Sequence, residues 1–207
     1  RTHRWEARSK QAHTREDQSL FGIVQGAFWP DLRKASAEAV GEIGFDGYAI
    51  GGLSVGEGHQ VMCDVLDATT PFMPKDRPRY LMGVGKPLDL VEAVARGVDM
   101  FDCVMPTRNA RNGMLFTRQG TLNMRNRKWE DDFSPLDPLG TADVDSRYSK
   151  AYVRHLFRAG EILALQIGTV HNLVFYLDLM REARERIADG TFRAWKDALL
   201  PVLTQRL

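Results

Sequence analysis

Short apolar runs alternate with amphipathic stretches over the first half of the chain. Four of the runs have the length and composition of strands that are buried on both faces: Leu20–Val24, Tyr48–Ile50, Tyr80–Met82 and Met100–Val104. Between them, apolar residues recur every three or four positions, as on a helix that packs along one side. This alternation is typical of right-handed βαβ crossovers and predicts a parallel sheet.

Three helices are expected between these strands. The first begins at Pro30, the second covers about His59–Ala68, and the third begins at Pro87 and ends at Gly97 or shortly before. Proline suits the first turn of a helix because the N–H that it lacks would have no intrahelical partner there. A polar, helix-forming segment, residues 4–17, precedes the first strand.

The pattern changes after the fourth strand. Gly113–Thr117 and Thr121–Met124 flank a turn and predict an antiparallel hairpin. A Pro/Asp/Ser-rich connection follows over residues 131–148, and the sequence is helical from Ser149 to the end. We therefore expect two domains: residues 1–130 with the sheet and the hairpin, and residues 131–207 with the connection and a helical subdomain.

The length of 207 residues would just hold a small eight-stranded α/β barrel, since these start at roughly 200 residues. Only four strand–helix units are present, so about half of the strands of a closed barrel are missing. The chain also starts at Arg1 without an initiator Met. We expect the second half of a larger barrel, whose open sheet would need a partner to cover its edge.

Composition narrows the class of protein. Lys and Arg total 28 against 27 for Asp and Glu, which gives a formal net charge of +1 and excludes a uniformly basic nucleic-acid binder. The two cysteines, Cys63 and Cys103, form no CxxC pair and suit a reducing cytosol. No signal peptide or membrane span is expected, so the predicted location is cytoplasmic.

Ligands of parallel α/β folds bind at the carboxyl ends of the strands. Asp102 stands there, within an apolar run where a carboxylate without a partner would be costly. It is either a nucleophile or general base, or an acid that pairs with Arg108 or caps a neighbouring turn. The loops around Gly51-Gly52 and Gly83-Val84-Gly85-Lys86 are tight turns or supply N–H groups to a ligand. Gly83-Val84-Gly85-Lys86 has the glycine spacing of neither a Walker A motif nor a dinucleotide-binding motif.

Cations gather on and around the predicted hairpin. No Asp or Glu occurs between Pro106 and Lys128, whereas six cations lie there, with Phe116 and Trp129 nearby: Arg108, Arg111, Arg118, Arg125, Arg127 and Lys128. Such a surface suits a phosphate backbone with stacked bases. The alternative is a solvated basic face.

Four long motifs resemble the tRNA-guanine transglycosylase family, and Val55 resembles its bacterial branch. They are Phe21–Gly26, Tyr48–Glu57, Tyr80–Pro87 and Met100–Arg108. Gly44–Gly47, Arg108–Gly113 and Arg158–Glu161 also resemble family segments, so the likeness extends over nearly the whole chain.

The resemblance implies a TIM-barrel transferase that exchanges guanine at the tRNA anticodon wobble position for a 7-deazaguanine precursor of queuosine. Asp102 matches the nucleophile, which would form a covalent aspartyl-ribose intermediate. The base-binding positions that it implies are Gln25, Gly52, Leu53 and Met82. The tRNA-binding positions are Gly83, Val84, Gly85, Lys86, Pro87, Leu88, Asp89, Thr107, Arg108, Asn109, Ala110 and Arg111.

Two departures from the family stand out. Its zinc-binding Cys-x-Cys-x-x-Cys corresponds to Gly140, Ala142 and Asp145 here, and only His171 of the ligand set is left. One imidazole and one carboxylate do not make the four-ligand shell of structural zinc, so we expect no metal at this site and no other cofactor. The family's other essential carboxylates belong to a half that precedes Arg1.

Three functions follow. The first is an enzyme, or the carboxy-terminal half of one, that acts on a tRNA anticodon loop and a 7-deazaguanine base, with a homodimer as a further partner and no membrane. The second is a catalytically incomplete remnant that binds tRNA. The third is an unrelated phosphate-binding barrel fragment, for which the glycine loops are the only support.

Overall fold

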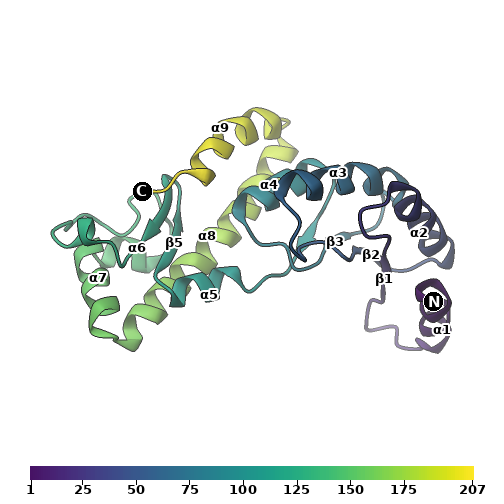
Figure 1. Cartoon of the computed structure of the whole chain (residues 1–207), viewed down its shortest axis with the longest axis horizontal. Coiled ribbons are helices and arrows are strands. Elements are labelled where there is room, and N and C mark those ends of the chain that lie inside the picture. Colours follow the sequence, from purple (N-terminus) through teal and green to yellow (C-terminus); the bar gives the residue numbers. More distant parts are fainter. The chain divides into compact units, whose positions relative to one another are not determined.

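The computed structural model describes all residues, 1–207 (Figure 1). It contains two compact units, residues 1–103 and residues 104–207. The predicted hairpin belongs to the second unit, with the C-terminal helices. The two domains expected from sequence, residues 1–130 and 131–207, stay a prediction.

The first unit is built on a four-stranded parallel sheet whose strands follow one another in chain order. The strands are β1 (Phe21–Val24), β2 (Gly47–Ile50), β3 (Arg79–Leu81) and β4 (Met100–Phe101). Val24, Ile50 and Leu81 are adjacent across β1 to β3 and have no exposed surface, so they form the centre of the core. The α/β class with a parallel sheet is therefore confirmed.

Burial on both faces, expected for all four strands, holds only for β2. Residues of β1 alternate between partly buried and buried, and neither residue of β4 is buried. The reason is position, because β1 and β4 are the two edges of the sheet and each has one neighbour.

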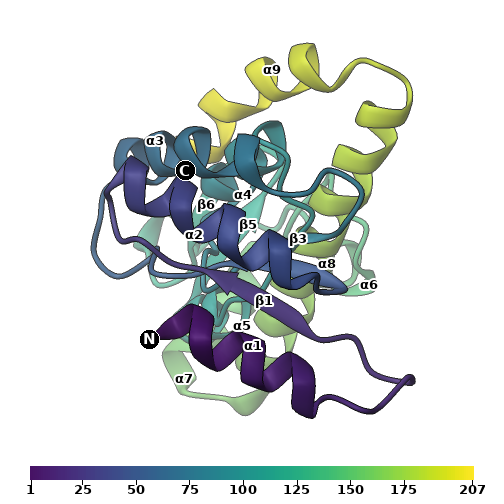
Figure 2. The same cartoon turned by 90° about the vertical axis from the view of Figure 1, so that its right-hand side faces the viewer.

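Helices follow β1, β2 and β3, as the periodicity predicts. They are α2 (Pro30–Ile43), α3 (His59–Thr69, extended by the 3-10 turn Thr70–Phe72) and α4 (Pro87–Ala95). The polar lead-in forms α1 (Thr2–Ala12), and Figure 2 shows α1 and α2 beside β1. Glu6 of α1 accepts a hydrogen bond from the backbone N–H of Ile23, which ties the lead-in to β1 at 2.7 Å.

The second unit contains the hairpin and five helices. Its elements are α5 (Met105–Arg111), β5 (Met114–Thr117), β6 (Gly120–Asn123), the 3-10 turn Arg127–Trp129, α6 (Asp143–Arg147), α7 (Lys150–Ala159), α8 (Ile162–Ala188) and α9 (Phe192–Thr204). The antiparallel hairpin is confirmed. No helix was predicted at α5, although its start at Met105-Pro106 carries proline in the first turn.

Helix α8 organises this unit through the buried side chain of Asn172. Its Oδ1 accepts a hydrogen bond from the N–H of Phe116, and its Nδ2 donates to the carbonyls of Pro106 and Met114. One amide thus satisfies backbone groups of both α5 and β5. Length and composition alone would let α8 cross a membrane, and 44% of its most apolar stretch is buried in the fold. The absence of a membrane partner stays a prediction.

Candidate active site

Asp102 follows β4 directly and receives two hydrogen bonds from the neighbouring strand and its turn. The hydroxyl of Tyr80, on β3, donates to Oδ1 at 2.6 Å, and the backbone N–H of Gly83 donates to the same oxygen at 2.8 Å. Neither donor reaches Oδ2. The carboxylate is thus held through Oδ1, and Oδ2 takes part in neither bond.

These two hydrogen bonds set the protonation states of the pair. The bond from Tyr80, and after it the bond from Gly83, lowers the pKa of Asp102 below its ordinary value. The same contact with Asp102, with a smaller effect of burial, raises the pKa of Tyr80 to about 12. At neutral pH the carboxylate is therefore an anion beside a protonated phenol, which is the state that a carboxylate nucleophile needs.

The expectation of a buried Asp102 is wrong. The residue is exposed, because β4 ends at Phe101 and Asp102 already lies beyond the strand. Its hydrogen-bond partners within the first unit are Tyr80 and Gly83, and the bond from Gly83 agrees with the expected cap on a neighbouring turn. A nucleophilic role is compatible with the same geometry.

Gln25 and residues 51–57, here called the glycine loop, meet at the carboxyl ends of β1 and β2. A Cβ atom on Gly51 would lie 2.5 Å from Nε2 of Gln25, and one on Gly52 would lie 3.3 Å from its Oε1. Gly52 also has a φ of 72°, which favours glycine. The amide of Gln25 and the backbone of this loop therefore lie side by side at this edge of the sheet, and their role in binding a base stays a prediction.

The two apolar positions expected at the base site differ in exposure. Leu53 is buried in the first unit, whereas Met82, which directly follows β3, is partly exposed. Met82 is thus available to pack on a flat ring. The side chain of Leu53 supports the loop from below, and its backbone is the part available to a ligand.

Arg33 of α2 holds the two strand ends together, and sequence reasoning missed it. Its guanidinium is fully buried and donates to the carbonyls of Val24 at 3.2 Å, Ala27 at 2.8 Å and Gly51 at 2.8 Å. Burial lowers the pKa of Arg33, although arginine stays charged at any ordinary pH. Arg33 fixes the backbone on either side of Gln25, and a cation among apolar helix positions was its only sequence signal.

Glu57 closes the glycine loop on itself. Its carboxylate accepts hydrogen bonds from the backbone N–H groups of Ser54 and, at 2.8 Å, of Val55. Burial raises the pKa of Glu57, and the backbone hydrogen bonds lower it by more, so the net shift is downward. Ser54 has a φ of 62°, rare for a residue with a side chain, so this carboxylate stabilises a strained turn. Glu57 is the last residue of the motif Tyr48–Glu57, and no role was predicted for it from sequence.

The segment from Gly83 to Asp89, expected to contact tRNA, is only partly accessible. Gly83 and Lys86 are exposed and Leu88 is partly exposed, while the remaining members are buried: Val84, Gly85, Pro87 and Asp89. Asp89 bonds to Nδ1 of His59 at 2.6 Å. Lys86 is therefore the exposed cation of this loop, since the backbone N–H of Gly83 is already bonded to Asp102.

The segment from Thr107 to Arg111 lies on α5 in the second unit. Arg108 and Arg111 are exposed in the last turn of the helix, and Thr107 and Asn109 are partly exposed. Ala110 has no exposed surface and belongs to the core of the unit. A contact between this segment and RNA would therefore come from its arginines and polar side chains, and not from the side chain of Ala110.

The basic patch is less open than its composition suggests. Arg118 pairs with Glu182 at 2.8 Å, so its charge is partly neutralised by a residue far along the chain. Phe116 is buried against Phe175 and Tyr176, which rules out the expected stacking of its ring on a base. The reason is that β5 is covered on both faces, since the adjacent residues Leu115 and Phe116 are both buried, and the alternation of the hairpin did not reveal this.

The remaining cations of the patch are exposed. Arg127 is 93% exposed in its side chain and makes an ion pair with Glu130 at 3.5 Å. Lys128 lies over the ring of Trp129, which is partly exposed and offers the aromatic surface that Phe116 does not. The available basic surface therefore consists of fewer groups than the sequence indicated.

The four positions that the resemblance assigns to zinc do come together. Asp145 bonds to Nδ1 of His171 at 2.5 Å and accepts the N–H of Ala142 at 2.9 Å, and Gly140 lies directly against its carboxylate. The donor atoms present are one carboxylate and one imidazole, both engaged in hydrogen bonds. No cluster of three or more His, Cys, Asp or Glu side chains in the chain is arranged to hold a metal ion, and these residues do not fit structural zinc.

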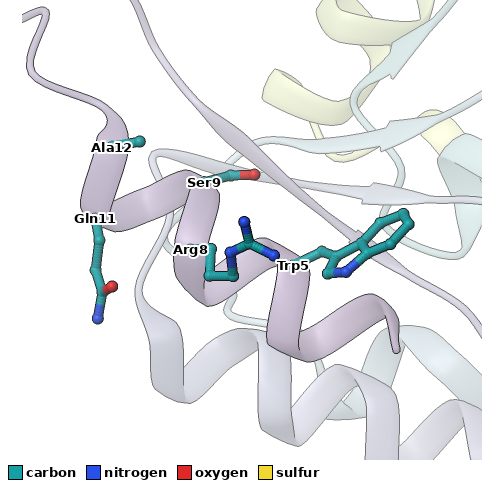
Figure 3. Close-up of a pocket in the computed structure, with 5 residues that line it drawn as sticks. All are labelled: Trp5, Arg8, Ser9, Gln11 and Ala12. Carbon is teal, nitrogen blue, oxygen red and sulfur yellow. The ribbon is translucent and has the colours of Figure 1, made fainter.

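A separate surface hollow lies along α1. It measures about 790 Å³ and is lined by Trp5, Arg8, Ser9, Gln11 and Ala12. Figure 3 shows that Gln11 extends in a different direction from Trp5. The hollow is lined by this one helix and contains none of the residues around Asp102, so it is not the candidate site.

Comparison with known proteins identifies a family with similar sequences. A sequence model described as "Queuine tRNA-ribosyltransferase" matches residues 1–204. Relatives with that name include one from Halothermothrix orenii, 56% identical over 200 residues, which are 97% of this chain and 54% of the relative. Another, from Caulobacter vibrioides, is 56% identical over 93% of this chain and 52% of the relative, and one from Aquifex aeolicus is 52% identical over 100% and 55%.

These matches cover nearly all of this chain and only part of each relative. The chain spans about half the length of the curated relatives it matches. The family model includes the Asp102 site, the glycine loop and the second unit, since it matches residues 1–204. The chain therefore belongs to the queuine tRNA-ribosyltransferase family.

Proposed function

We propose that this chain is the nucleophile-bearing half of an enzyme that exchanges guanine at the tRNA wobble position for a 7-deazaguanine precursor of queuosine. Family membership supports this function. The observation that carries it is the ionised carboxylate of Asp102, held through Oδ1 by Tyr80 and Gly83. An anchored anion with one oxygen left for attack suits a covalent intermediate at a sugar carbon.

The proposed exchange has two displacements. Oδ2 of Asp102 attacks C1′ of the ribose, the C1′–N9 bond breaks, and guanine leaves with the electron pair and takes up a proton. The ring nitrogen of the incoming base then loses its proton and attacks C1′, and the Asp102–ribose bond breaks. The residue that moves these protons belongs, by the resemblance, to the half that precedes Arg1.

The polar surface beside Asp102 is suited to a purine-like base. The amide of Gln25 offers a donor and an acceptor, and the backbone at Gly52 and Leu53 adds further polar groups at the same sheet edge. Met82 supplies an apolar contact for the ring face. Arg33 and Glu57 act as positioning residues, because they hold the strand ends and the loop that carry these groups.

Exposed cations supply the proposed contact with the anticodon loop. Lys86, Arg108 and Arg111 all stand at exposed positions. A loop nucleotide is already unpaired, so turning its base toward Asp102 costs less than extrusion from a duplex. The phosphate contacts would position the RNA and make its binding depend on salt.

The fold supports a half-barrel. Parallel strands in the order β1-β2-β3-β4, each joined to the next by a helix, are what half of a TIM barrel contributes. We place the chain as the second half of a (β/α)8 barrel, with domains at residues 1–130 and 131–207. A cytoplasmic location and a homodimer belong to the same proposal.

Guanine exchange tests the proposal. The full chain is incubated with an anticodon stem-loop that carries labelled guanine at the wobble position, and label release and a covalent protein–RNA band on a denaturing gel are measured. We expect both signals from the parent chain and from Asp76→Asn, a matched change at an exposed acid, and neither from Asp102→Asn.

The second candidate function is a tRNA-binding remnant, favoured by the fact that the chain spans about half of its relatives. Binding of the stem-loop at low salt without exchange or adduct would support this candidate and reject exchange by this chain alone. Absence of binding at low salt would reject both.

A further inference from the structure

A buried acid–base pair joins α6 to α8 in the second unit. Oδ1 of Asp145 lies 2.5 Å from Nδ1 of His171, and both residues are almost fully buried. The other ring nitrogen, Nε2, lies 2.8 Å from the carbonyl oxygen of Phe116 on β5. One histidine therefore connects three segments that are far apart in sequence.

The hydrogen bonds of this pair form a closed set. The carbonyl of Phe116 can only accept, so Nε2 carries the hydrogen, and one further proton lies between Nδ1 and Oδ1. Oδ2 of Asp145 accepts the N–H of Ala142 at 2.9 Å. Every polar atom of the pair thus has a partner, which is the condition under which buried polar groups stabilise a fold.

The pair also fills the space around it. A Cβ atom on Gly140 would lie 2.1 Å from Oδ2 of Asp145 and 2.7 Å from its Cγ. Real Cβ atoms do not approach this closely, so Gly140 has no room for a side chain while Asp145 points at His171. A cysteine at residue 140 and this aspartate at residue 145 are therefore mutually exclusive in this arrangement.

Neighbouring acids do not complete a metal shell. The carboxylate of Asp137 accepts the backbone N–H groups of Leu139 at 3.0 Å and Arg118 at 3.4 Å. The carboxylate of Asp178 bonds to the hydroxyl of Thr141 and to Arg181. Both are already satisfied, so the donor set stays at one carboxylate and one imidazole.

We propose that the Asp145–His171 pair replaces a metal ion as the cross-link of the second unit, so that this part of the family fold is held without zinc. The pair connects residues 140–145 to α8, and through Phe116 it connects α8 to the hairpin. A structural zinc ion joins distant segments by bonds to their side chains. In this chain the hydrogen bond between Asp145 and His171 joins two such segments directly.

Metal content of the full chain tests the replacement. After purification with zinc present, the parent chain binds no stoichiometric zinc, and a chelator leaves its melting temperature unchanged. The variant G140C/A142C/D145C restores three thiols beside His171, and it binds about one zinc per chain. Cobalt substituted into that variant gives thiolate charge-transfer absorption, whereas the matched variant G140S/A142S/D145S gives none.

Two substitutions of Asp145 separate hydrogen bonding from shape. Asp145→Leu removes both bonds and lowers the melting temperature by about 10 °C. Asp145→Asn can donate to Nδ1 and still accept from Ala142, so it keeps most of the stability. Asp143→Asn, on the exposed side of α6, is the control and leaves the melting temperature unchanged.

Three results would overturn the replacement. They are one zinc per parent chain, a fall in its melting temperature with chelator, and an unchanged melting temperature for Asp145→Leu. If Asp145→Leu does not fold, the comparison between the parent chain and the cysteine variant decides by metal content alone.

Discussion

The hydroxyl of Tyr80 donates a 2.6 Å hydrogen bond to the same oxygen of Asp102 that receives the N–H of Gly83. The two donors come from β3 and from the turn that follows it, while the acceptor follows β4. Adjacent parallel strands therefore place the acid and its donors in contact without help from distant segments. The candidate nucleophile is ionised by its neighbours in the sheet.

Tyr80→Phe removes the stronger of these two influences, so the pKa of Asp102 rises toward its ordinary value. A carboxylate with a lowered pKa stabilises the fold above its ordinary value, and that stability is lost as pH falls through the lowered value. The variant should lose this contribution at a higher pH than the parent. Carbon-detected NMR titration of the Asp102 carboxyl measures the shift, with Tyr152→Phe in the second unit as control. An unchanged midpoint would show that Tyr80 does not hold the charge.

Gly51→Ala should weaken binding of the base without unfolding the chain. The new Cβ would lie 2.5 Å from Nε2 of Gln25, and the amide must turn away from the loop. We expect the affinity for guanine to fall about tenfold, the loss of roughly one well-placed hydrogen bond to a ligand. Calorimetric titration with guanine measures it. Gly41→Ala, where the new atom meets only open space, should bind as the parent does.

Arg33→Met should lower the free energy of unfolding by roughly 3 kcal/mol, since two buried carbonyls and one partly buried carbonyl lose their donor. Urea unfolding followed by circular dichroism gives the value. Lys34→Met, at the next position of α2 and half exposed, should change it by less than about 0.5 kcal/mol. Equal effects of the two variants would mean that the hydrogen bonds of the Arg33 guanidinium add nothing to the free energy of unfolding.

The glycine loop should open as pH falls. Glu57 has a lowered pKa, so its bonds to Ser54 and Val55 persist at and above the ordinary carboxyl range and are lost below it. The amide resonances of Ser54 and Val55 should therefore move together as pH falls through that lowered value. In Glu57→Gln they should not titrate. If the amides of the parent chain kept their positions to pH 3 or so, the carboxylate would not be what closes the loop.

Elements with a strong period could be predicted from sequence. The spacing of apolar residues predicted all four parallel strands and the hairpin, because each is a local pattern. Helix α5 was missed because it is short and directly follows a strand. The exposure of Asp102 was also missed, since β4 ends at Phe101 and the apolar run continues to Val104.

Residues that act at a distance could not be predicted in the same way. Arg33 reaches carbonyls on both sides of the loop, and Tyr80 reaches an acid 22 positions later. Both contacts depend on which strands are neighbours, and neither residue type is distinctive where it stands. The same holds for Asp145, which the sequence marked only as a lost ligand and which the fold turns toward His171.

Both cysteines of the chain, Cys63 and Cys103, belong to the first unit. The second unit, residues 104–207, is consequently a fold with no thiol to oxidise. Disulfide-forming reagents have no side chain there that they could couple, and the Asp145–His171 link contains no sulfur. The hairpin and its long helix should therefore be unaffected by thiol-specific oxidants that release zinc from thiolate sites.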